Sequence, residues 1–140
     1  MLLADTSAWI WSRRSGHIEL RRWFDELVES GEIVTCDQVR LELLYGTRSA
    51  FEHERRRREL QALDTCPVGT REWARAIGVQ GSLARFGADH QKAVQPADLL
   101  VAAAAEGAGV ELLHYDADFE WVAKVTQQPL RWLAPRGSLR

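Results

Sequence analysis

The sequence predicts an α/β protein, a three-layer α/β/α sandwich around a central, mostly parallel sheet of four or five strands. Short apolar runs alternate along the chain with longer amphipathic segments, which is the order found in βαβ units. The first run, Leu2-Leu3-Ala4, is apolar at consecutive positions, as in parallel strands that helices cover on both faces. The 140 residues are 46% hydrophobic and 27% charged, which fits one globular domain over residues 1–140.

Four apolar segments are expected as strands: residues 2–4, 32–35, 110–113 and 130–133. Each is a short run that contains Leu, Ile or Val and lies between polar or glycine-containing segments. Residues 63–68 form a further extended segment, either a short strand or a connector, because Pro67 interrupts it.

Helices are expected between these strands, where apolar residues recur at helical spacing. The first helix follows Asp5, with Thr6 or Ser7 as its N-cap. A later helix begins at Asp37, which is expected to cap it, and ends at Gly46. The remaining helices are expected at residues 18–29, 49–63, 70–86, 96–105 and 116–125, with a polar loop over residues 87–96.

Acidic residues stand at positions that this fold would bring together: Asp5, Glu42, Asp98, Asp116 and Asp118. Asp5 follows the first expected strand, and Asp116 and Asp118 follow the third. Asp98 opens the helix that leads into that third strand. In an open parallel sheet, the carboxyl ends of the strands line the ligand crevice at the point where the strand order reverses.

Carboxylates gathered in one crevice repel each other unless a cation neutralises them or their pKa values rise. Mg²⁺ and Mn²⁺ are hard cations that take oxygen ligands, often a few carboxylates together with waters and phosphate oxygens. Such a site can lower the pKa of a bound water and stabilise an in-line displacement at phosphorus. The sequence therefore predicts a divalent-metal site, without indicating whether it holds one ion or two.

Each acid also has a purely structural interpretation. Asp5 could cap the first helix, and Asp98 could sit where helix N-termini favour acids in any protein. Glu42 lies on a helix with an apolar stripe and could point into solvent, while Asp116 and Asp118 could be surface caps. Acids that only cap separate helices would not all have to lie at one edge of one sheet. Their shared position therefore favours a common metal-binding site.

Four motifs in this order resemble those of PIN-domain proteins, specifically the VapC-type toxin ribonucleases of bacterial toxin–antitoxin pairs. They are LADTSAW at residues 3–9, VRLELLYG at 39–46, PADLLVAA at 96–103 and HYDADF at 114–119. The closing WLAPRG at residues 132–137 resembles an actinobacterial branch of that family. Each motif is short, but together they cover essentially the whole chain.

The resemblance implies a PIN-like fold and a Mg²⁺-dependent endoribonuclease, with Mn²⁺ as a plausible substitute, acting on structured RNA such as tRNA or rRNA. It also implies a homodimer and a cognate antitoxin that binds and blocks the acidic site. By motif position, the implied catalytic acids are Asp5, Glu42, Asp98 and Asp116. The implied metal ligands are Asp5, Asp98, Asp116 and Asp118, with the last as an accessory ligand or water-orienting group.

Three further residues are expected to support the site. Thr6 and Ser7 match the hydroxyl position of the family beside the first acid, where they could hold its carboxylate or a water. His114 departs from the pattern, because many relatives have Thr two residues before the fourth acid. It could orient a water, contact RNA, or be a packed polar residue at a strand end.

Arginines supply the local positive charge of a chain whose net charge is only −2. The candidates for contacts with RNA phosphates or with an acidic antitoxin segment are Arg13, Arg14, Arg55, Arg56, Arg57 and Arg58. The run at residues 55–58 has an equally simple alternative, a solvated helix face with ion pairs to neighbouring glutamates.

Composition also indicates the compartment. Cys36 and Cys66 lack a CxxC spacing, which argues against a structural zinc site and favours a reducing cytosol. The first residues do not resemble a signal peptide, and no stretch approaches the ~20 apolar residues of a membrane span. The protein is therefore expected to be cytoplasmic, with no membrane partner.

Two other functions stay open. A phosphoacceptor α/β domain also carries acids at strand ends, but Lys124, the only lysine after Lys92, falls inside a predicted helix instead of at a phosphoryl site. A non-catalytic interaction module on the same scaffold would bind RNA or antitoxin without cleavage, and the presence of all the acids argues against it. No GxSxG, Walker or GxGxxG motif supports a serine hydrolase, a P-loop protein or a Rossmann protein.

Overall fold

The computed structural model describes all residues of the chain, 1–140, and a four-stranded sheet lies at its centre. The strands are β1 (Leu2–Ala4), β2 (Ile33–Val34), β3 (Glu111–His114) and β4 (Leu130–Trp132). Their spatial order is β2-β1-β3-β4, and all three pairings are parallel. The prediction of a mostly parallel sheet of four or five strands is therefore confirmed, with four strands.

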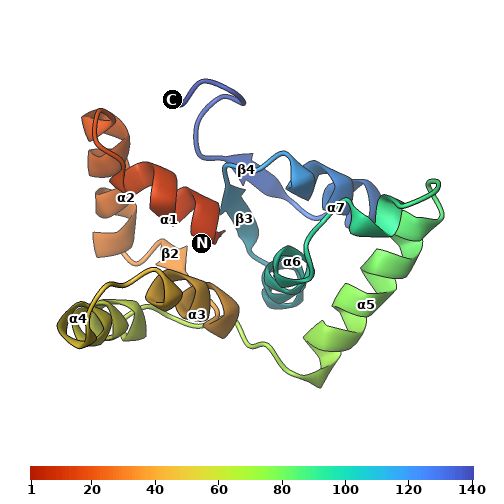
Figure 1. Ribbon diagram of the computed structural model, residues 1–140, viewed down its shortest axis with the longest axis horizontal. Coiled ribbons are helices and arrows are strands. Elements are labelled where there is room, and N and C mark those ends of the chain that lie inside the picture. Colours follow the sequence, from red (N-terminus) through yellow and green to blue (C-terminus); the bar gives the residue numbers. More distant parts are fainter.

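Helices cover both faces of this sheet. They are α1 (Thr6–Arg13), α2 (Ile18–Glu29), α3 (Asp37–Tyr45), α4 (Ala50–Gln61), α5 (Thr70–Ala84), α6 (Pro96–Ala108) and α7 (Asp118–Thr126), with a 3₁₀ turn η1 at His90–Lys92. Figure 1 shows α1 and α2 on one side of the sheet and α6 on the other, with α5 and α7 beyond it. The predicted three-layer α/β/α sandwich is confirmed. None of the helices combines the length and apolarity needed to cross a bilayer.

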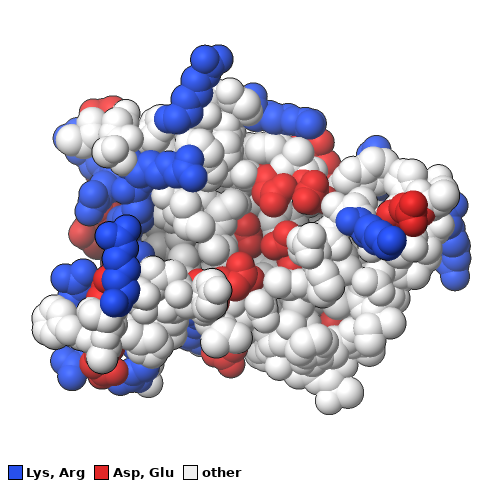
Figure 2. All heavy atoms as spheres, viewed as in Figure 1, with Lys and Arg blue, Asp and Glu red and all other residues white.

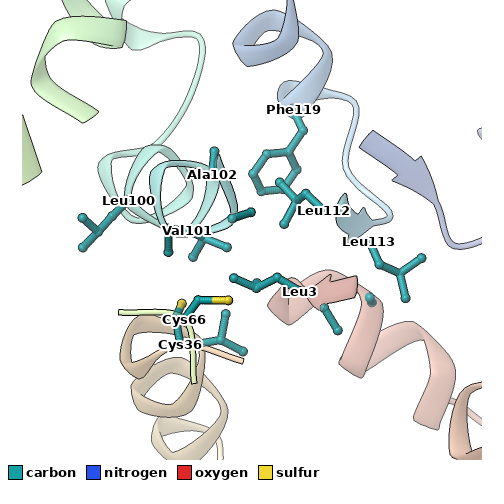
Figure 3. Packing of buried hydrophobic residues seen from close by; sticks show 14 of the residues in the cluster. Leu3, Cys36, Cys66, Leu100, Val101, Ala102, Leu112, Leu113 and Phe119 are labelled. Carbon is teal, nitrogen blue, oxygen red and sulfur yellow. The ribbon is translucent and has the colours of Figure 1, made fainter. Parts of the chain in front are cut away.

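The hydrophobic core lies between the two central strands and α6. All three residues of β1 are buried, and so are seven consecutive residues of α6, from Leu99 to Ala105. Four of those seven are alanines, so the helix can lie close to the sheet. Figure 3 shows side chains of α6 beside Leu3, Leu112 and Phe119. This rigid centre fixes the ends of β1 and β3, from which the acidic residues project.

The strand order creates a switch point between β1 and β3. From β1 the chain crosses to β2 on one side, and from β3 it crosses to β4 on the other side. The backbone N–H of Asp5 donates to the carbonyl of Leu113 at 2.9 Å, which continues the ladder past the end of β1. The two strand ends therefore open into one crevice, where doubly wound folds bind ligands.

Residues 63–68 form a connector, which is one of the two predicted alternatives; they contribute one isolated bridge between Thr35 and Thr65, and Pro67 leaves little room for a longer ladder. The predicted N-caps of two helices were wrong. The N-cap of α3 is Cys36 instead of Asp37, which is the first helical residue. The N-cap of α1 is Asp5 instead of Thr6 or Ser7, because its backbone is extended and its carboxylate accepts the Ser7 N–H. Other helix ends differ by a few residues, as α6 continues to Ala108 and α5 stops at Ala84.

Candidate active site

Asp5 is the most buried of the acidic side chains, with 2% of its surface exposed. Its Oδ2 accepts the backbone N–H of Ser7 at 3.0 Å and the Ser7 hydroxyl at 2.7 Å. Its Oδ1 is buried and has no hydrogen-bond partner in the protein. Burial raises the pKa of Asp5 to about 6, although the hydrogen bonds from Ser7 oppose the rise. One carboxylate oxygen is thus fixed by the fold, and the other is left for a ligand.

Ser7 joins the two strand ends that carry the acids. While its hydroxyl donates to Asp5, the same oxygen accepts the backbone N–H of Tyr115 at 2.9 Å. The chain after β3 is therefore tied to the first turn of α1. Thr6, the other hydroxyl expected to support the site, has a buried Oγ1 without a hydrogen-bond partner. Of the two predicted supporting hydroxyls, only that of Ser7 contacts the first acid.

Asp116 and Asp118 lie at the start of α7. Asp116 is partly buried, and its Oδ1 accepts the backbone N–H of Asp118 at 2.9 Å, so this carboxylate closes the first turn of the helix. Burial and then the charge of Asp116 raise the pKa of Asp118. The two acids are therefore electrostatically coupled, and Asp116 is the one whose orientation the backbone fixes.

His114 is completely buried and stacks near Phe119 and Trp132, at ring distances of 5.2 and 4.6 Å. Its Nδ1 accepts the backbone N–H of Asp116 at 3.1 Å, which assigns the ring proton to Nε2. Burial lowers the pKa of His114 and keeps the ring neutral. Of the roles expected for His114, the packed polar residue is the one that this geometry supports. It holds the backbone of Asp116 and does not reach solvent.

Asp98 lies in the first turn of α6 and faces the other acids. Burial is the largest cause of a pKa of about 7 for Asp98, raised from 3.8. The charges of the remaining acids are the next causes, in the order Asp5, Asp116, Glu42 and Asp118. A carboxylate whose pKa responds to four others lies near the centre of the group.

Glu42 approaches the same place from α3. It is partly buried, and its charge raises the pKa of both Asp5 and Asp98. Gln38, one helical turn earlier, donates its Nε2 to Glu42 Oε1 at 3.1 Å. The sequence interpretation missed Gln38 as a supporting residue, although the i, i+4 spacing of an amide and an acid on one helix was the available signal.

The five predicted acids therefore share one region at the switch point. Figure 2 shows acidic atoms gathered in the hollowed middle of one face, between the part formed by α1, α2 and α4 and the part formed by α5 and α7. In this arrangement no three His, Cys, Asp or Glu side chains are close enough to coordinate a single ion. The acids approach one another without closing into a preformed cage.

This donor set fits Mg²⁺ better than it fits a closed structural metal site. All the side chains offer hard oxygen atoms, and Asp5 Oδ1 is a buried oxygen with no other partner. Mg²⁺ commonly uses one or two carboxylates and completes its octahedral shell with waters and substrate phosphates. Zn²⁺ sites usually include His or deprotonated Cys ligands. Here the Nδ1 of His114 accepts the Asp116 N–H, and burial raises the pKa of the Cys36 thiol to about 11, which disfavours the thiolate.

The arginines predicted to contact RNA or antitoxin lie on two helices beside the acids. Arg13 and Arg14 end α1, where Arg13 forms an ion pair with Asp25 and Arg14 lies 3.8 Å from the ring centre of Trp11. The four arginines of residues 55–58 belong to α4 and point to different sides of it. None of the six lies within the acidic group itself.

A family model for the PIN domain matches residues 2–125 of the chain. The chain belongs to the PIN-domain family. It is 42% identical to ribonuclease VapC18 of Mycobacterium tuberculosis over 135 residues, which cover 96% of each protein. It is also 36% identical over 137 residues to ribonuclease VapC51 of the same organism, covering 98% of this chain and 96% of that one. The resemblance inferred from the four motifs is confirmed.

Solved structures show the same PIN fold. DNA-bound VapBC from Salmonella typhimurium matches with a TM-score of 0.70, at 18% identity and over 95% of this chain and 98% of that one. VapBC2 from Rickettsia felis, bound to a promoter DNA fragment, matches with a TM-score of 0.69, at 15% identity and over 94% and 97% of the two chains. At these identities the likeness concerns the fold alone.

Proposed function

We propose that this PIN-domain protein is the toxin of a type II toxin–antitoxin pair, a divalent-metal-dependent endoribonuclease that hydrolyses RNA phosphodiester bonds. The observation that carries the proposal is the position of Asp98, at the switch point and within the field of four other carboxylates. A group of unpaired acids destabilises a fold, and a cation together with a phosphodiester would relieve it. Relatives of 42% and 36% identity are named ribonucleases, which supports the same activity.

Asp5, Asp98 and Asp116 are the proposed metal ligands, with Asp118 as an accessory group. Mg²⁺, or Mn²⁺ in its place, would supply an activated water and stabilise the charge of the displacement at phosphorus. Ser7 holds Oδ2 of Asp5 and leaves Oδ1 without a partner for the metal, and the backbone bond to Asp118 orients Asp116. Glu42 is held at Oε1 by Gln38, which leaves its Oε2 to orient a water or accept a proton.

The proposed partners are RNA, such as tRNA or rRNA, and a cognate antitoxin. Several solved structures with this fold are toxin–antitoxin complexes, which supports the antitoxin. We also propose a homodimer that acts in the cytoplasm. Large apolar side chains that are exposed on α3, α4 and α5 support a protein interface: Leu41, Tyr45, Phe51, Trp73 and Ile77. Light scattering of the purified protein tests the dimer, and a monomeric mass would contradict it.

Cleavage of total RNA by the purified protein tests the activity. We expect defined cleavage products with Mg²⁺ or Mn²⁺, none with EDTA, and none from Asp98→Asn with either metal. A wild-type protein that leaves RNA intact with both metals would contradict the proposal and favour a non-catalytic interaction module. The observation that favours the non-catalytic module is that no three His, Cys, Asp or Glu side chains converge on one metal position.

A further inference from the structure

Helix α4 carries its charged residues on two separate faces. Glu52, Arg55, Arg56 and Glu59 are spaced i, i+3, i+4 and i+7 and form one face, named here the inner face of α4. Glu54, Arg57, Arg58 and Gln61 have the same spacing and form the outer face of α4. The ion pairs follow this grouping, because Arg56 pairs with Glu59, whereas Arg57 and Arg58 both pair with Glu54.

The outer pair is engaged within its own face. Arg57 donates to both carboxylate oxygens of Glu54, at 2.9 and 2.8 Å, and to Gln61 at 2.7 Å. Arg58 donates to the same Glu54 at 3.1 Å. These bonds fit the alternative of a solvated helix face with local ion pairs. Such pairs contribute little to stability, so the outer face offers a matched control.

The inner face lines a cleft of about 440 Å³ between α4 and the α1–α2 pair. All its lining residues are charged: Arg13, Arg21, Asp25, Glu52, Arg55, Arg56 and Glu59. Arg13 and Arg21 both pair with Asp25, and Arg56 lies 3.6 Å from Glu59. Arg55 is exposed, and its guanidinium forms no ion pair or hydrogen bond in the structure. The cleft therefore offers an unpaired guanidinium next to partly paired ones.

A second, smaller hollow of about 240 Å³ connects this cleft with the helices of the acidic site. It shares Arg13 and Arg56 with the first cleft and adds Arg14, Trp9, Ile10 and Leu43 as lining residues. Leu43 follows Glu42 on α3, and Trp9 lies one turn after Asp5 on α1. Figure 2 shows basic side chains bordering the central hollow on the side of α1, α2 and α4.

We propose that Arg55 and Arg56 are positioning residues that bind backbone phosphates of the RNA strand on one side of the cleaved bond, while Arg57 and Arg58 take no part. The inference rests on the proposed ribonuclease function. A strand with one phosphate at the acids has to leave the hollow, and the surface lined by Arg13, Arg14 and Arg56 leads to the inner cleft. Positive charge and N–H donors on the protein are enough to bind backbone phosphates and so to position the RNA strand, whatever its sequence.

A protein segment fits this cleft less well than a phosphate backbone does. Protein interfaces have an apolar centre with a polar rim, and the inner cleft has no hydrophobic lining residue. Guanidinium groups match phosphate oxygens through paired N–H donors. The inner arginines are therefore assigned to the substrate and not to the antitoxin.

Binding of a fluorescein-labelled single-stranded RNA of mixed sequence, measured by anisotropy in the cleavage-deficient Asp98→Asn background, tests the inference. We expect the pair Arg55→Gln and Arg56→Gln to weaken binding by about three- to tenfold. The slope of log K against log salt should fall by about 1.4, since each phosphate contact contributes about 0.7 on a single strand. The control pair Arg57→Gln and Arg58→Gln should change neither quantity.

Two further readouts separate a phosphate contact from damage to the helix. Arg55→Lys with Arg56→Lys keeps the charge, and we expect it to restore most of the binding. In the cleavage-competent protein, the inner glutamine pair should raise KM and leave kcat unchanged, because the contact lies away from the reacting atoms. Unchanged thermal unfolding of all the pairs would show that the fold is intact.

If the inner and the outer glutamine pairs weakened RNA binding equally, the assignment would be overturned, because the affinity would then depend only on the total positive charge of α4. Loss of antitoxin binding by the inner pair, with RNA binding unchanged, would overturn it in favour of a protein contact. A wild-type protein that binds RNA through the inner pair yet cleaves nothing would leave this inference standing and refute the proposed nuclease. The two proposals can therefore fail separately.

Discussion

Asp98 shows how a single residue can carry an unfavourable charge for the sake of a site. Its carboxylate makes no side-chain hydrogen bond, and its burial, followed by the charges of four other acids, raises its pKa to about 7. Asp5 has a pKa of about 6 for the same main reason. In a protein selected for stability alone, neutral side chains would be preferred at both positions.

Replacement of Asp98 by Asn should abolish cleavage and stabilise the metal-free protein by about 1–2 kcal/mol, after allowance for screening by solvent. Asn has nearly the same shape but no charge to repel its neighbours. Thermal unfolding in EDTA and the RNA cleavage assay measure the two effects. Asp64→Asn, on an exposed acid outside the site that forms no ion pair, is the matched control and should change neither.

The pH dependence of stability follows from the same two residues. Both pKa values are raised above the unfolded value of 3.8, so the folded state binds more protons than the unfolded state between about pH 4 and pH 7. Their contribution to stability is complete below about pH 4 and is lost as the pH rises to about 7. Urea unfolding in EDTA across this range should show the loss, and Mn²⁺ should reverse it at pH 7.5. An unchanged unfolding midpoint in the double variant Asp5→Asn, Asp98→Asn, relative to wild type at pH 7.5, would contradict the explanation.

At the scale of elements, the Ser7 hydroxyl makes two hydrogen bonds, one to Asp5 at the start of α1 and one from Tyr115 in the chain after β3. Ser7→Ala removes both and leaves the Tyr115 N–H without its partner. We expect a loss of about 1–2 kcal/mol in the free energy of unfolding. Cleavage should fall as well, because Asp5 keeps only the backbone N–H of residue 7 to orient it. Ser30→Ala, which removes one exposed hydrogen bond to the Leu27 carbonyl, is the control and should cost less.

Arg40 connects α3 to the end of α4. Its guanidinium donates to the carbonyls of Leu60 and Leu63 and pairs with Asp37, and only 18% of its side chain is exposed. Arg40→Met should keep much of the packing but leave these carbonyls unpaired, at a cost of about 1–3 kcal/mol in unfolding free energy. Denaturant unfolding measures this, and a change below about 0.5 kcal/mol, the usual range at open surface positions, would contradict the role.

At the scale of the whole molecule, hydrophobic patterning was enough to predict the architecture. The consecutive apolar residues of β1 and the alternation of short strands with helices indicated a parallel sheet, and the acids that follow β1 and β3 indicated where the crevice would be. The apolar pattern and the acids are both features of short sequence segments. The rules for connecting parallel strands then predict where those segments lie in three dimensions.

Details that depend on side-chain partners could not be predicted in the same way. The tie between Ser7 and the Tyr115 backbone joins residues 108 positions apart, and no local pattern announces it. The burial of His114 became visible only once Phe119 and Trp132 were placed around it. The grouping of the four arginines also needs the structure, because Arg55 and Arg58 are i, i+3 neighbours and only the ion pairs with Glu54 set Arg57 and Arg58 apart.

Calorimetric titration of the metal-free protein with Mn²⁺ at pH 7.5 tests the central claim most directly, namely that the acids at the switch point form a cation site. We predict saturable binding by the wild-type protein and its loss in Asp5→Asn and in Asp98→Asn, with both variants folded. No heat of binding to the folded wild-type protein, or the same affinity in all three proteins, would contradict the account.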